Sequence, residues 1–272
     1  MHFSHDARLP ALTRAQGARL RALLQDKQVR AKEGAFVVEG AKAVGDLLTR
    51  FPEQILTLVI TPPYLARESP AIRHRRHGVT AKQYSCTEQR FGTLSEVEAP
   101  QGILAVIQQP KWDEERVLSQ SNILGIFGER LQDPANVGAI TRTAAALHAD
   151  ALWLTPESAD VYNPKVVRAA SGALLSLPIF LAPDVSGLIQ RGCRIYAADV
   201  SRCGTIPIDE IGEAPRKLVL AVGNEGRGLS IATSKTAALR FTIPLSRDVE
   251  SLNVAATIAI SLFHFSRLPK RG

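Results

Sequence analysis

Three polar stretches of the chain carry side chains with the clearest capacity for chemistry. One of them, GNEGRGLS (223–230), interrupts the aliphatic run LVLAV, and the other two are NVGAITRTA (136–144) and IPLSRDVESLNVA (243–255). An amide, a carboxylate and a guanidinium can hold a polar substrate, accept a proton and stabilise negative charge on an oxygen. Asn136, Arg142, Asn224, Glu225 and Asn253 are candidates that carry such groups, and Ser251 adds a hydroxyl.

The spacing of Gly223, Gly226 and Gly228 excludes two common nucleotide sites. It matches neither the G-x-G-x-x-G pattern of dinucleotide binding nor the G-x-x-x-x-G-K-[ST] pattern of a P-loop. The glycines predict a loop whose backbone makes unusual turns or lies against a flat ligand, because a Cβ atom would collide there. An ordinary glycine-rich turn is the alternative interpretation.

The other two polar stretches stand at predicted helix starts. Asn136, Gly138 and Arg142 come where a strand turns into a helix, so backbone N–H groups and the helix dipole are available to an anion. We place Arg142 about one and a half turns into that helix, from where it could reach back over the loop. A capped helix with a surface arginine is the alternative. At the last helix, capping explains Ser251 more easily than Asn253.

The elements that position these stretches alternate between strands and helices. Apolar, β-branched strands of this kind are typical of a parallel sheet with helices on both faces, in which ligands bind beyond the carboxyl ends of the strands. Strands are predicted at 123–130, 151–155, 193–200, 217–222 and 238–245, and helices at 139–149, 163–176 and 251–265.

Residues 1–110 predict a smaller α/β module, joined by a charged linker at 111–122 to a second domain at 123–272. Helices are expected at 18–34 and 41–51, strands at 35–40, 55–61 and 103–110, and helix and turn over 81–102.

The charge balance favours a polyanionic partner. The chain of 272 residues has a net charge of +7, and residues 1–110 hold 15 Lys and Arg against 10 Asp and Glu. The densest basic run, 72–78, is either a solvated loop or a phosphate contact. Cys86, Cys193 and Cys203 match neither a disulfide framework nor a metal site. The chain shows no signal core or membrane span, so we expect a cytoplasmic protein.

The three polar stretches, in this order and spacing, closely resemble the sequence motifs of the SpoU, or TrmH-like, RNA ribose methyltransferases. FVVEGAKAVGDLL (36–48) is similar to the start of that family's L30e-like substrate-binding domain. The resemblance implies an α/β fold, with a C-terminal parallel sheet tied in a trefoil knot and a smaller N-terminal L30e-like domain.

The resemblance also implies a reaction. The family transfers a methyl group from S-adenosylmethionine to a ribose 2′-hydroxyl of ribosomal or transfer RNA, without a metal and usually as a homodimer. Ribosomal RNA is favoured, because the L30e-like domain is more typical of members that act on it. By motif position, main-chain groups of Gly223, Ile243 and Leu252 bind the cofactor. The loops around the cofactor also contain Asn224, Glu225, Gly226 and Leu245.

The catalytic set implied by motif position is Asn136, Arg142, Glu225, Ser251 and Asn253. Arginine remains protonated up to a pKa above about 12. We therefore interpret Arg142 as a clamp for an RNA phosphate and for charge on the reacting oxygen, with Glu225 as an alternative proton acceptor. An RNA-binding protein that no longer methylates is a second hypothesis. A general nucleotide-dependent α/β enzyme is a third, and it is disfavoured by the glycine spacing.

Overall fold

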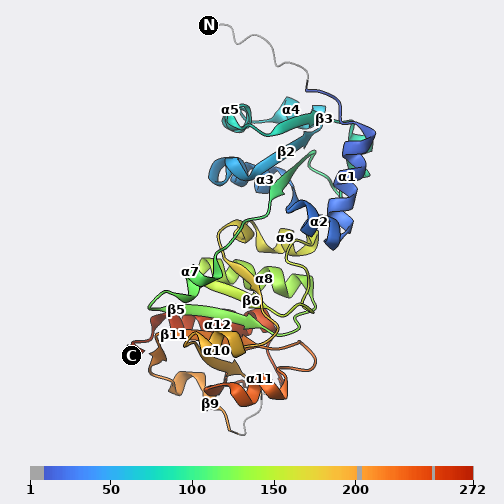
Figure 1. Cartoon of the computed structure of the whole chain (residues 1–272). Coiled ribbons are helices and arrows are strands. Elements are labelled where there is room, and N and C mark those ends of the chain that lie inside the picture. Colours follow the sequence, from blue (N-terminus) through green and yellow to red (C-terminus); the bar gives the residue numbers. More distant parts are fainter. Residues whose placement is uncertain (1–8, 201–203, 247–248, 272) are drawn as a thin grey trace. The chain divides into compact units, whose positions relative to one another are not determined.

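The structure is a computed structural model that describes residues 9–200, 204–246 and 249–271 (Figure 1). The chain divides into two compact units, one formed by 1–110 with 162–168 and the other by 111–161 with 169–272. Each unit has its own sheet and its own buried core. Cys203 lies outside the described residues, and no described helix is long and apolar enough to cross a membrane.

The first unit is built on a four-stranded mixed sheet in the order β1-β4-β2-β3. Strand β4 is antiparallel to β1 and β2, and β2 is parallel to β3. The strands are β1 (Ala35–Glu39), β2 (Ile55–Ile60), β3 (Lys82–Ser85) and β4 (Ile103–Gln108). The helices are α1 (Arg14–Gln25), α2 (Lys27–Glu33), α3 (Ala41–Arg50), α4 (Pro62–Arg67), α5 (Pro70–Gly78) and α6 (Glu88–Gly92).

Three predictions for this unit need correction, and the first two concern residues 18–34 and 81–102. The helix expected over 18–34 is divided at Asp26, whose extended backbone ends α1 and whose carboxylate accepts the N–H of Gln28 to begin α2. Helix and turn were expected over 81–102, and α6 confirms the helix. Lys82–Ser85, however, forms β3 beside β2, and its residues after Lys82 are half-buried. Pairing with a neighbouring strand decided this element, because the segment is short and its own pattern is weak.

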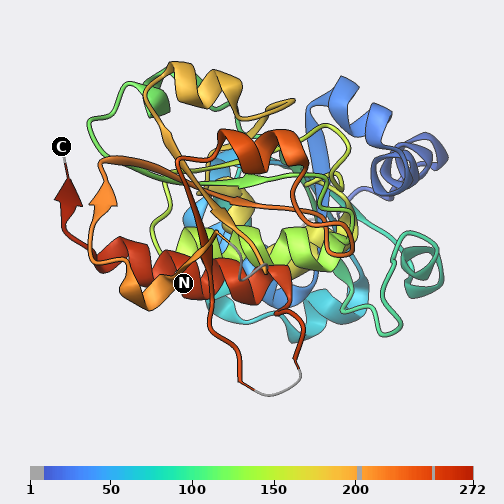
Figure 2. The ribbon, with the colours of Figure 1, turned by 90° about the horizontal axis from the view of Figure 1, so that it is seen from below.

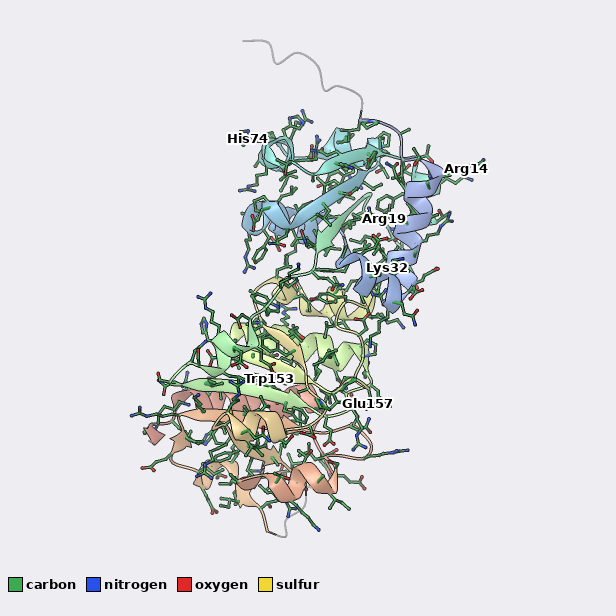
Figure 3. All side chains as sticks on the ribbon, in the orientation of Figure 1. Arg14, Arg19, Lys32, His74, Trp153 and Glu157 are labelled. Carbon is green, nitrogen blue, oxygen red and sulfur yellow. The ribbon has the colours of Figure 1, made fainter. Side chains whose placement is uncertain are left out.

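The basic run at 72–78 lies in α5, so its interpretation as a loop is wrong. Arg76 is only 2% exposed and donates two hydrogen bonds to the buried carboxylate of Glu68, at 2.9 and 3.0 Å. A third hydrogen bond joins Arg76 to Gln83. His74 of this run and Arg14 of α1 extend outward from the unit (Figure 3), and Arg19 and Lys32 of the first two helices are also exposed. One member of the basic run is therefore structural, while its neighbours are exposed.

The second unit confirms the predicted parallel α/β sheet. Seven strands pair in the order β7-β6-β5-β11-β8-β12-β9, and every neighbouring pair is parallel. They are β5 (Ile123–Gly128), β6 (Ala151–Leu154), β7 (Ile179–Leu181), β8 (Arg194–Ala198), β9 (Ile206–Pro207), β11 (Lys217–Val222) and β12 (Leu239–Thr242). A separate two-stranded pair joins β10 (Ala214–Pro215) to β13 (Lys270–Arg271).

Helices cover both faces of this sheet, as expected (Figure 2). The long helices α8 (Pro134–Ala146) and α12 (Val254–Arg267) pack side by side on one face. The other face is covered by α7 (Glu114–Leu118), α10 (Ser186–Gln190) and α11 (Ile231–Thr236). Helix α9 (Pro164–Ala170) is assigned to the first unit as far as Arg168. Sequence reasoning missed β7, β9, α10 and α11, which are too short to show a clear periodicity.

The segment 111–122 packs with the second unit. Val117 and Leu118 of α7 are buried in its core, and Glu114 accepts a hydrogen bond of 2.6 Å from the indole N–H of Trp153. Trp153 is fully buried, so this bond satisfies a polar group that would otherwise lose its contact with water.

Candidate active site

The stretch 136–144 lies entirely within α8, although the prediction began the helix only at Ala139 and left 136–138 in the preceding loop. Asp133 caps the helix by accepting the N–H of Ala135 at 2.9 Å, and Pro134 occupies the first helical position. The helix therefore begins five residues before the expected start at Ala139. Asn136 consequently projects from the first turn, where it is buried.

Asn136 joins the three polar stretches. Its side-chain nitrogen donates to Oε1 of Glu225 at 3.0 Å, and its side-chain oxygen accepts a hydrogen bond of 2.9 Å from Asn253. These partners are 89 and 117 residues away along the chain. The first turn of α8, the loop after β11 and the residue that caps α12 therefore meet at one buried amide.

Asn253 is the N-cap of α12, so the interpretation of Ser251 as its cap is wrong. The side-chain oxygen of Asn253 accepts the N–H of Ala255 at 2.8 Å, while its nitrogen reaches Asn136. An amide side chain can accept a hydrogen bond at the helix end and donate another to a neighbour at the same time. Ser251 is exposed two residues earlier, without a hydrogen bond to the described part of the chain.

The GNEGRG loop is a narrow hairpin braced by Asn224. The main chains of Asn224 and Gly228 exchange two hydrogen bonds, of 3.1 and 2.8 Å, and the Asn224 side-chain oxygen accepts the N–H groups of Gly226 and Arg227. Its side-chain nitrogen donates to the carbonyl of Arg130. Asn224 thus shapes the loop, and this leaves Glu225 exposed at its tip beside Asn136.

The structure explains why two positions of this loop are glycine. A Cβ atom at Gly223 would lie 2.1 Å from the backbone of Gly228 and Leu229, and Gly228 has a φ of +66°. The close approach at Gly223 is therefore to the loop itself, which agrees with the prediction of unusual turns. A flat ligand is not needed to explain this glycine.

Arg142 is not part of the hydrogen-bonded group. It is exposed on α8, about two turns from the helix start rather than one and a half, and about 9 Å along the axis from Asn136. Six residues of helix also turn its direction by about a third of a revolution from that of Asn136. Arg142 makes no ion pair or hydrogen bond with the residues that the structure describes.

Main-chain groups are available in the third stretch. Leu245 and Leu252 are half-buried and lie in segments without regular secondary structure. Within the described ranges, no hydrogen bond engages their N–H or C=O groups. Because half-buried main-chain groups need partners, these positions fit a ligand such as adenine, which offers both donors and acceptors. The residues present are therefore compatible with S-adenosylmethionine.

A cavity of about 450 Å³ lies elsewhere, at the opposite ends of α8 and α12. Leu147, His148, Phe263 and Arg267 are among its lining residues, and none of the predicted site residues is. We assign the site to the strand ends, because the polar side chains meet there and not in the cavity. Among the described residues, no group of His, Cys, Asp and Glu side chains is arranged to hold a metal.

Comparison with known proteins gives two family matches. The SpoU rRNA Methylase family matches residues 124–263, and the MRM3-like substrate binding domain matches residues 19–105. A 23S rRNA (guanosine(2553)-2′-O)-methyltransferase of Bacillus subtilis is 31% identical over 89% of this chain and 92% of its own length. A 23S rRNA (uridine(2479)-2′-O)-methyltransferase of Streptomyces viridochromogenes is 30% identical over 97% and 95%.

Solved structures agree with these matches over nearly the whole chain. The AdoMet-bound rRNA methyltransferase from Sinorhizobium meliloti has a TM-score of 0.79 and 26% identity, covering 96% of this chain and 97% of that one. The SpoU methyltransferase AviRb from Streptomyces viridochromogenes, in complex with AdoMet, has the same TM-score and identity over 93% and 98%. From its sequence, its fold and these relatives, this chain belongs to the SpoU rRNA methylase family.

Proposed function

We propose that this protein transfers the methyl group of S-adenosylmethionine to a ribose 2′-hydroxyl of ribosomal RNA. The observation that carries the proposal is the hydrogen-bonded series from Asn253 through Asn136 to Glu225, which unites the three family motifs. Relatives whose names state 2′-O-methylation of 23S rRNA and structures titled as AdoMet complexes support it.

S-adenosylmethionine, when bound, supplies an electrophilic methyl group. Main-chain groups of Gly223, Ile243, Leu245 and Leu252 hold the adenine in this proposal, and Asn224 and Gly226 keep the hairpin in the shape that it requires. Direct alignment of the two reacting groups supplies much of the rate enhancement, because a displacement at a methyl carbon needs its partners in line.

The ribose hydroxyl must lose a proton as it attacks. In our proposal Arg142 binds an RNA phosphate and stabilises the developing charge on the oxygen, while Asn136 and Ser251 hold the ribose. Asn253 fixes the orientation of Asn136, to which it donates. Glu225 is the second candidate for proton acceptor, since its carboxylate is exposed and accepts from Asn136 through Oε1.

Residues 1–110 bind the RNA in this proposal, with 111–122 as the linker and 123–272 as the methyltransferase domain. The match to an MRM3-like substrate binding domain and the exposed basic residues of α1 and α5 support this role. The preference for ribosomal over transfer RNA rests on the relatives' names. The L30e-like fold, the trefoil knot, the absence of a metal and the cytoplasmic location stay predictions from the sequence.

We also propose that the protein is a homodimer. Ile260 and Phe263 lie on the outer face of α12 and are 40% and 49% exposed. Exposed apolar residues that share one helix face favour contact with another protein surface. A second copy of the chain is the partner expected from the family resemblance, and Arg142, on the adjacent helix α8, could then act in either copy's site.

Two measurements test the proposed function. Isothermal titration should show binding of S-adenosylmethionine, and a map of 2′-O-methylation across total RNA should lose one ribosomal site when the protein is removed. Binding of RNA without binding of S-adenosylmethionine would support the alternative of a protein that no longer methylates. A lost site in transfer RNA would contradict the proposed substrate but not the chemistry.

A further inference from the structure

Arg130, the second residue after the carboxyl end of β5, has an unusual backbone conformation. Its φ is +52°, in the left-handed region that glycine adopts without strain and arginine rarely does. Both neighbouring peptide groups are held: the N–H of Arg130 donates to Thr155 at 2.9 Å, and its C=O accepts from Asn224 at 3.0 Å. The loop thus requires this conformation, although an arginine occupies it.

The guanidinium of Arg130 has few interaction partners within the described protein. Its Nε atom is buried and finds no acceptor among the residues that the structure describes, while the side chain as a whole is 36% exposed. The nearest carboxylate oxygen, Oε1 of Glu129, is 3.8 Å from Nη2, which is too long for a hydrogen bond. The other oxygen of Glu129 accepts the N–H of Ser230. Arg76, by contrast, donates from Nε and Nη2 to the two carboxylate oxygens of Glu68.

Arg130 is also attached to the site. Asn224 donates to its carbonyl and lies 3.4 Å from Oε2 of Glu225, whose other oxygen is held by Asn136. The guanidinium of Arg130, whose Nε has no acceptor, therefore lies at the carboxyl ends of the strands, together with the residues that we assign to the ribose. A left-handed backbone is unfavourable for a residue with a Cβ atom, so a role for the arginine side chain would compensate for this strain.

We propose that Arg130 is a substrate-binding residue that holds a phosphate of the RNA backbone next to the methylated ribose. The proposal rests on the proposed function above. A planar guanidinium can donate two parallel hydrogen bonds to two phosphate oxygens, and Nε is one of its donors. With Arg142 on a second phosphate, Arg130 would fix the target nucleotide from another side. The carboxylate of S-adenosylmethionine is the other oxyanion that could occupy this position.

The variant Arg130→Gly tests the proposal, because it removes the guanidinium and relieves the backbone strain. We expect a melting temperature that is equal or higher, an unchanged Kd for S-adenosylmethionine, and about tenfold weaker binding of an unmodified large-subunit rRNA transcript. The slope of log K against log salt should fall by about 0.7 to 0.9, the value for one lost phosphate contact. Arg130→Lys should retain part of the affinity.

Arg216→Gln is the matched control, since it removes an exposed positive charge just before the amino end of β11, whereas Arg130 follows the carboxyl end of β5. It should leave RNA affinity within about twofold of the wild type if Arg130 acts locally. A lower melting temperature for Arg130→Gly with unchanged RNA binding would overturn the proposal in favour of a structural role. Weaker binding of S-adenosylmethionine with unchanged RNA binding would assign Arg130 to the cofactor. Failure of the wild type to methylate RNA would instead contradict the proposed function.

Discussion

Asn136 determines the geometry of the site through both ends of one amide. It donates to Glu225 and accepts from Asn253, and neither an aspartate nor a leucine of similar size could do both. An aspartate would also place a second negative charge beside Glu225, which raises the cost of ionising either group. The buried position of Asn136 makes these partners necessary as well as possible.

Arg142 offers the sharpest test of a single residue. Arg142→Ala should lower the rate of methyl transfer at least 100-fold, because it removes charge stabilisation at the reacting oxygen. The Kd for S-adenosylmethionine and the melting temperature should stay nearly unchanged, since Arg142 is exposed and has no bond to the described residues. Calorimetry and a transfer assay measure the two effects separately. Loss of cofactor binding with unchanged transfer would show that the role is assigned wrongly.

At the scale of elements, the hairpin after β11 depends on the missing side chain of Gly223. Gly223→Ala should lower the melting temperature and weaken S-adenosylmethionine binding more than tenfold, because its Cβ would lie 2.1 Å from the Gly228 backbone and would force the hairpin open. Gly226→Ala is the control. A Cβ atom at Gly226 would lie 3.7 Å from its nearest neighbour, Asn224, so the melting temperature of this variant should equal that of the wild type. Equal melting temperatures for both variants would contradict this account of the loop.

Helix α5 contains two adjacent arginines, of which Arg76 is buried and Arg75 is exposed. Arg76→Met should lower the free energy of unfolding by about 3 to 5 kcal/mol, because it leaves the buried Glu68 carboxylate without its partner. Arg75→Met, one residue away and exposed, should change it by less than about 0.5 kcal/mol. In our proposal Arg75→Met instead weakens RNA binding. Denaturant titration and RNA binding of the two variants, measured together, would show whether stability and RNA affinity separate in this way.

At the scale of the whole molecule, variants on the outer face of α12 test the proposed oligomeric state. Light scattering should find a dimer for the wild type, and the double variant Ile260→Asp with Phe263→Asp should be a folded monomer, because two charges would have to be desolvated in the interface. Leu181→Asp changes a residue that is 66% exposed on β7, away from α12, and should remain dimeric. A wild-type monomer, or a dimer that survives the double variant, would refute this interface.

Local patterns in the sequence were sufficient for part of this description. The apolar runs predicted the parallel sheet, and the three polar stretches contained the residues that meet at Asn136. The start of α8 was signalled by Asp133 and Pro134, a cap and a first-turn proline, but the prediction began the helix too late. The burial of Arg76 had no local signal, because it depends on Glu68 and on Gln83 of another element.

The sequence by itself determined which residues could do chemistry and that a parallel sheet would carry them. The tertiary structure alone decided which of them touch. Strand β11 lies beside β5 although 88 residues separate their ends, Gly128 and Lys217, and this pairing brings Glu225 to Asn136. Strand order depends on long-range packing rather than on local periodicity, so neither this contact nor the strained backbone of Arg130 could be read from neighbouring residues.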